Sequence, residues 1–79
     1  MNNDNTVKVV GERLRRARGL AMMSTSEAAA IAGISRQALA NYESGTRAIR
    51  VDALARLVNA YGVDANWIIG IAERLEVGT

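Results

Sequence analysis

Residues 33–45 read GISRQALANYESG, and this stretch decides how the rest of the chain is interpreted. Ser35 is a preferred N-cap residue, because its hydroxyl accepts a hydrogen bond from the unpaired amides of a first helical turn. Leu39 and Tyr42 are three residues apart and therefore share one helix face. The spacing predicts a short helix over about 36–44, with one buried face and one outward face, closed by Gly45.

The outward face of this helix carries Arg36, Gln37, Ala40 and Asn41. A guanidinium pairs with guanine O6 and N7, a carboxamide with adenine N6 and N7, and a methyl group contacts the thymine methyl in a DNA major groove. We therefore expect Arg36 to contact guanine, Gln37 and Asn41 to contact adenine, and Ala40 to contact thymine. The alternative is an ordinary solvated helix face.

Composition sets limits on the protein class. With 79 residues the chain forms one small domain. It has no cysteine and no histidine, so no disulfide, metal site or cofactor is expected, and no nucleophile–base set indicates an enzyme. Nine of the ten cations are arginine, which suits phosphate and base contacts. No apolar run has the length of a membrane span, and we expect a cytoplasmic protein.

The periodicity of apolar residues predicts an all-α fold, a compact bundle of five short helices. Residues 1–6 are expected to be a disordered tail, 7–70 the folded domain, and 71–79 a tail that is helical or lies at a dimer contact. The predicted helices cover about 7–19, 36–44 and 51–61. A further helix is capped by Ser24, which forms a capping box with Glu27, and ends at Gly33, and a short helix follows Asp64.

The segments on either side of residues 33–45 complete a known pattern. Residues 25–44 have a small residue at Ala29, glycine at Gly33 and apolar residues at Ile34, Leu39 and Tyr42. YESG follows at 42–45, AYGV at 60–63 and WII at 67–69. Over about residues 10–70 the chain resembles the XRE family of phage repressors and Cro proteins, the lambda-repressor-like helix-turn-helix proteins.

The chain departs from the family pattern at four positions. Thr25 replaces a glutamine that helps to brace the recognition helix, and Ile49 replaces a loop proline. Ala28 and Ala32 replace large apolar residues, so we expect the second helix to lie closer to the core.

The resemblance implies roles for further residues. Arg18 and Glu43 are expected to form a structural ion pair between the first and third helices. Leu39, Tyr42 and Trp67 are expected in the core. Contacts to DNA phosphates are expected from residues flanking the recognition helix, namely Ser24, Thr25, Thr46, Arg47 and Arg50.

These features predict a regulator of the repressor type, bacterial or phage-encoded, that binds a palindromic double-stranded DNA operator as a homodimer. The dimer contact is expected in a segment that is partly exposed in the monomer, with Val63, Trp67, Ile68, Ile69 and Ile71. The alternatives are an antitoxin with a toxin partner, a restriction-modification controller of the same fold, and a protein-interaction module that does not bind DNA.

Overall fold

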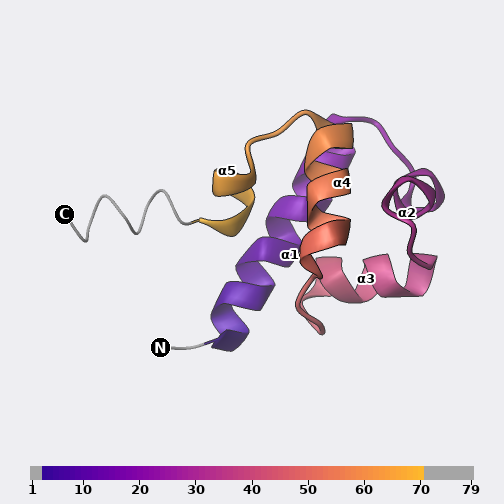
Figure 1. Cartoon of the computed structure of the whole chain (residues 1–79). Coiled ribbons are helices and arrows are strands. Elements are labelled where there is room, and N and C mark those ends of the chain that lie inside the picture. Colours follow the sequence, from indigo (N-terminus) through magenta and orange to yellow (C-terminus); the bar gives the residue numbers. More distant parts are fainter. Residues whose placement is uncertain (1–2, 71–79) are drawn as a thin grey trace.

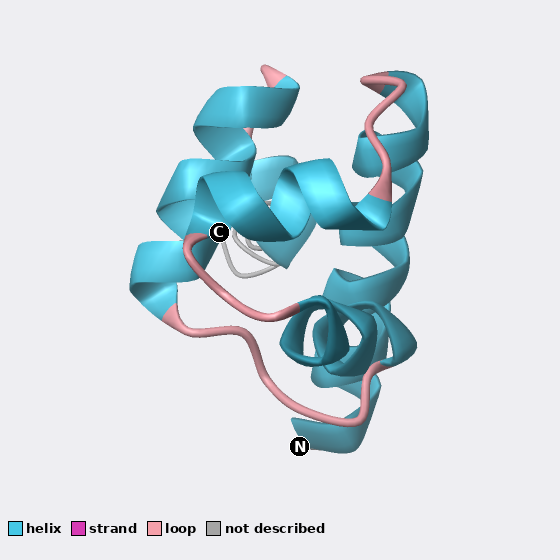
Figure 2. Ribbon diagram, turned by 90° about the vertical axis from the view of Figure 1, so that its right-hand side faces the viewer, coloured by secondary structure: helices cyan, strands magenta, loops and turns pink. Residues whose placement is uncertain are grey.

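The computed structural model describes residues 3–70, which form five helices and no strand (Figures 1 and 2). This confirms the predicted all-α fold. The helices are α1 (Asn3–Leu20), α2 (Thr25–Ala32), α3 (Arg36–Ser44), α4 (Val51–Tyr61) and α5 (Ala65–Ile69).

The first helix is longer than the sequence predicts. The expected start at Val7 is wrong, because α1 begins at Asn3, and residues 3–6 are helical rather than part of a disordered tail. Thr6 and Val7 line an apolar cavity together with the loop after α3 and with α5. This tertiary contact partly buries Thr6 and Val7, which local sequence does not reveal.

The core lies where α1 meets the other helices. The helices α1, α3, α4 and α5 each contribute one fully buried large side chain: Leu14, Leu39, Leu57 and Ile68. The α1 helix packs mainly on α3 and α5, whereas α2 packs on α4 and α3 (Figure 1). Burial of each such leucine or isoleucine contributes about 1.5–3 kcal/mol to stability.

The second helix packs through alanine alone. Ala28, Ala29 and Ala32 are at most 2% exposed and form its inward face. The smallest helix-forming side chain lets neighbouring backbones approach closely. Ala28 and Ala32 thus lie in the core, while the closer position of the helix expected from the departure from the family pattern stays a prediction.

Gly11 allows α1 to approach the end of α3, a role that the sequence analysis missed. A Cβ atom at this position would lie 2.4 Å from the Tyr42 carbonyl oxygen and 2.6 Å from the Glu43 carbonyl oxygen. Both obstacles are backbone atoms, which cannot rotate away. Only glycine therefore permits the observed distance between the two helices.

Arg13 attaches α5 to α1. Its Nη1 donates to the Trp67 carbonyl at 2.5 Å, and its guanidinium carbon lies 5.7 Å from the centre of the Trp67 ring. Trp67 is 38% exposed, so its predicted place in the core is wrong. Ile68, one residue later, occupies that place instead.

Candidate nucleic-acid interface

The start of α2 presents polar groups outward. The Ser24 hydroxyl accepts from the Glu27 amide at 3.1 Å, and Glu27 Oε1 accepts from the Ser24 amide at 2.8 Å, which is the predicted capping box. The bond from the Ser24 backbone amide to the carboxylate contributes most to lowering the pKa of Glu27, and the Ser24 side chain lowers it further. The Ser24 side chain is exposed at this helix end.

A tight turn then leads directly into α3. Gly33 ends α2 in the left-handed conformation, and the Ile34 amide donates back to the Ala29 carbonyl at 3.0 Å. Ser35 caps α3 by accepting from the Ala38 amide at 3.0 Å. The turn and both caps are formed by residues near in sequence.

The two faces of α3 are separated as predicted. Leu39 is fully buried and Tyr42 is 8% exposed, and both pack into the core. Arg36, Gln37 and Ala40 are exposed, and Asn41 is partly exposed. The expected base-contacting residues therefore lie on the outward side of the helix.

An open hollow joins this face to the start of α2. It is lined by residues of both helices, namely Thr25, Ser35, Arg36, Gln37 and Ala40. A phosphate-contact candidate thus lies beside three base-contact candidates, on one continuous surface. This is the arrangement needed to contact backbone and bases at the same time.

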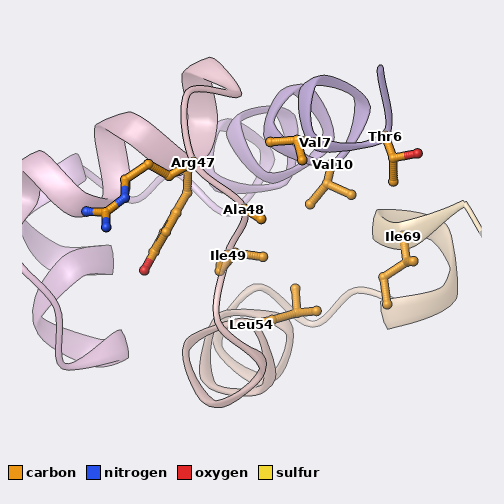
Figure 3. A pocket seen from close by; sticks show the side chains of 9 residues that line it. Thr6, Val7, Val10, Arg47, Ala48, Ile49, Leu54 and Ile69 are labelled. Atoms are coloured by element: carbon orange, nitrogen blue, oxygen red, sulfur yellow. The ribbon is translucent and has the colours of Figure 1, made fainter. Parts of the chain in front are cut away.

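The loop after α3 supplies the other cations. The amides of Thr46 and Arg47 both donate to the Asn41 carbonyl, at 3.0 and 3.2 Å, and the Thr46 hydroxyl lies 2.6 Å from that of Ser44. Both amides are thus already used. The Arg47 guanidinium is exposed and points away from the neighbouring cavity (Figure 3), whereas Ile49 is turned inward.

The cavity beside this loop has a volume of about 210 Å³ and is almost entirely apolar. It lies between α1, the end of α3 with the loop that follows, α4 and α5 (Figure 3). Its lining consists of Thr6, Val7, Val10, Tyr42, Arg47, Ala48, Ile49, Leu54 and Ile69.

Arg50 is the weakest of the phosphate candidates. It donates to Asp52 Oδ2 at 3.0 Å, and the two side chains are 71% and 49% exposed. An exposed pair of this kind contributes little to stability and opens easily. A phosphate would compete with Asp52 for Arg50, whereas Arg47 makes no ion pair within residues 3–70.

Arg18 connects three parts of the structure. Its Nε and Nη2 donate to the two carboxylate oxygens of Glu43, at 2.7 and 3.1 Å, so the ion pair implied by the resemblance is present. Its Nη1 donates to the Met23 carbonyl at 3.0 Å, immediately before the cap of α2. One guanidinium therefore fixes α1, the start of α2 and the end of α3 relative to each other.

Arg56 holds the other end of α2. Its Nη1 donates at 3.2 Å to the carbonyl of Ala32, which is the last residue of that helix. The sequence analysis missed this role, as it missed those of Gly11 and Arg13. An arginine spaced 24 residues from the carbonyl that it contacts leaves no recognisable signal in the sequence.

Tyr61 lies close to the Arg18–Glu43 pair. Its hydroxyl is buried and has no hydrogen-bond partner within residues 3–70. Burial raises the pKa of Tyr61 to about 12, the Glu43 carboxylate adds to the rise, and Arg18 opposes it. The hydroxyl is therefore a destabilising group in the core.

Replacing Tyr61 by phenylalanine should leave the free energy of unfolding at pH 7 unchanged or raise it by up to about 1 kcal/mol. Because the pKa is higher in the folded chain, the stability of the wild type should fall between about pH 10 and 12, where the unfolded chain ionises first. In denaturant unfolding, the free energy of unfolding of Tyr61→Phe should not show this part of the decline. Tyr42→Phe, the same chemical change, is the control and should retain it; parallel declines in the wild type and Tyr61→Phe would contradict the expectation.

The predicted dimer residues have different environments. Val63 and Ile69 are partly buried, with Ile69 facing the cavity, and Trp67 is partly exposed. Ile68 is fully buried within the monomer, so the prediction that it contacts a partner is wrong. A five-residue helix is too short for its inward residue to be identified from periodicity. Ile71 lies outside the described residues.

Within the described part of the chain, no group of three or more His, Cys, Asp or Glu residues is placed to hold a metal ion. None of the helices there has the length and apolar character needed to cross a membrane.

The fold and the outward face of α3 together define a helix-turn-helix protein, in which α2 supports α3 and α3 is presented to the partner. The model of the family described as helix-turn-helix matches residues 14–68, and the chain belongs to this family, of the XRE type. Among solved structures, it is similar to the restriction-modification controller protein C.AhdI from Aeromonas hydrophila. The TM-score is 0.71, with 25% sequence identity, covering 81% of this chain and 96% of that chain.

A comparison with curated proteins found no match. The family and the similar structure support a DNA-binding regulator.

Proposed function

We propose that the protein is a sequence-specific transcriptional regulator that places α3 in the major groove of double-stranded DNA and represses by occupying its operator. The observation that carries the proposal is the outward face of α3. It presents one guanidinium and two carboxamides beside the start of α2. Such a regulator acts in the cytoplasm, where bacterial and phage DNA lie.

The phosphate contacts in this proposal flank the base contacts. Ser24 and Thr25 at the start of α2 contact one strand, together with the free amides of that helix end. Arg47 contacts the backbone beyond the other end of α3, and Arg50 joins it once released from Asp52. Thr46 contributes through its hydroxyl, since its amide is already bonded within the chain.

A helix-turn-helix monomer contacts only a few base pairs, so the operator is a palindrome bound by a two-fold dimer with half-sites about one helical turn apart. The dimer contact lies around α5, where Trp67 is partly exposed, and includes Val63, Ile69 and the following Ile71. An antitoxin with a toxin partner remains the alternative assembly.

A second candidate function is favoured by one comparison. The similar controller protein C.AhdI is covered over 96% of its length, so the two chains share nearly the whole of that structure. This supports the more specific proposal that the protein controls a restriction-modification system. Binding to DNA upstream of restriction and modification genes in the source genome would distinguish it from a phage-type repressor.

The experiment is selection from a randomised duplex pool at moderate salt, with sequencing of the bound fraction. The wild type should enrich a palindrome, and Arg36→Ala should relax one position of each half-site and weaken binding about 10- to 100-fold per contact. Arg36→Lys is the matched control for charge: it keeps the cation but replaces the planar fork with a flexible ammonium, so it should relax that position less than Arg36→Ala does.

Arg47→Ala should behave differently. It should weaken binding to all sequences to a similar extent and reduce the salt dependence by about one counterion, because it removes a phosphate contact. If the wild type enriches no sequence and binds only weakly with steep salt dependence, the proposed function is wrong. A search for a protein partner would then follow.

A further inference from the structure

The two carboxamides on the outward face of α3 are hydrogen-bonded to each other. Gln37 Nε2 donates to Asn41 Oδ1 at 3.1 Å, one turn further along the helix. The bond lies on the surface that the proposed function assigns to DNA, and the following inference rests on that function. This bond uses one N–H of Gln37 and one acceptor site of Asn41, and so changes which groups of each amide remain to bond with a base.

An amide side chain has two N–H donors and one oxygen that accepts two hydrogen bonds. The bond uses one Gln37 N–H and leaves the other N–H and the oxygen. This remaining pair matches N7 and N6 of adenine. Asn41 keeps both N–H groups, but its oxygen is directed along the helix toward Gln37.

We propose that Gln37 and Asn41 recognise DNA as one coupled unit with two different preferences. Asn41 holds the Gln37 amide in the orientation that pairs with adenine. Asn41 itself presents two N–H donors and only the second acceptor site of its oxygen, and so favours an acceptor-rich edge at a neighbouring base pair. Guanine, with both O6 and N7 as acceptors, fits two N–H groups better than thymine, which has only O4. In this proposal Asn41 contacts guanine, and not adenine as the sequence analysis expected.

The coupling has a physical reason. A long exposed side chain loses rotamer freedom when it binds, and that loss weakens binding. In the free protein Gln37 is already held by Asn41, so part of this freedom is lost before DNA arrives. Removing Asn41 should therefore impair the contact of Gln37 with adenine, although Gln37 itself is unchanged.

The test compares base preferences of variants by selection from the randomised pool. Asn41→Ala should lose the guanine preference and also flatten the adenine preference of Gln37. Asn41→Asp keeps the oxygen that accepts from Gln37 but has no N–H, so it should retain adenine and replace guanine by cytosine, whose N4 donates to a carboxylate. Gln37 is exposed and Asn41 is partly exposed, and circular dichroism should show that each variant remains folded.

A double-mutant cycle quantifies the coupling on the selected operator. Gln37→Ala, Asn41→Ala and the double variant should deviate from additivity by about threefold or more in Kd. Arg36→Ala with Asn41→Ala serves as the control cycle and should be additive. Additive Gln37–Asn41 effects, or an adenine preference at both positions in the wild type, would overturn the inference while leaving the proposed function intact. If the wild type selects no motif, both fail.

Discussion

Gly11→Ala should lower the free energy of unfolding by about 2 kcal/mol, which corresponds to a melting temperature about 10 °C lower. The added methyl would overlap the carbonyl oxygens of Tyr42 and Glu43, at 2.4 and 2.6 Å. Overpacking of this kind costs about 1–3 kcal/mol or more, whereas alanine gains at most about 1 kcal/mol over glycine in a helix. The steric term should dominate, because both obstacles are backbone atoms.

Gly19→Ala provides the matched control within the same helix. A Cβ atom at Gly19 would have no heavy atom within 4 Å, so only the gain in helix propensity remains. This variant should be as stable as the wild type or more stable by up to about 1 kcal/mol in thermal unfolding. The close-approach argument fails if Gly11→Ala melts at or above the wild-type temperature.

Arg18→Met should destabilise the fold by about 3 kcal/mol, because it leaves the Glu43 carboxylate enclosed without its partner. The side chains of Arg18 and Glu43 are only 19% and 8% exposed, so water replaces little of the lost interaction. The double variant, Arg18→Met with Glu43→Met, should lose less than Arg18→Met alone, since no unpaired charge remains. Urea unfolding of the singles and the double measures this difference.

The exposed pair Arg50–Asp52 is the control for this cycle. Its side chains are 71% and 49% exposed, and Arg50→Ala should change the free energy of unfolding by less than about 1 kcal/mol. A double variant that loses the full sum of the Arg18 and Glu43 single effects would show that the two residues act independently. The pair would then not act as a joint connection between α1 and α3.

Features that depend on neighbouring residues were predictable from the sequence. The caps at Ser24 and Ser35 and the ends at Gly33 and Gly45 each involve residues within about one turn, so residue type and spacing are sufficient. The outward face of α3 followed from the positions of Leu39 and Tyr42. The membership of Arg36 and Gln37 in this exposed face was predicted in the same way.

Features that depend on distant contacts were not predictable. The start of α1 depends on a cavity shared with segments far along the chain, and Gly11 is needed only because α3 passes beside it. Ile68 lies in the core where Trp67 was expected. The Trp67 carbonyl accepts from Arg13, which is 54 residues away in the sequence. In the proposed coupled unit the direction of the Gln37–Asn41 bond decides the base preference, but residue spacing predicts only that the two side chains are near each other.

Arg13, Arg18 and Arg56 share one property: each donates to a backbone carbonyl, of Trp67, Met23 and Ala32 respectively. Every residue type has that carbonyl, so the hydrogen bond itself places no restriction on the acceptor side chain. Substitutions at Met23 should therefore keep this hydrogen bond, and their cost should come only from its partly buried side chain, which packs against the core, whereas no other residue type can replace the donor guanidinium of Arg18. The arrangement of the helices thus depends on a few arginine donors, whose carbonyl acceptors do not depend on residue type.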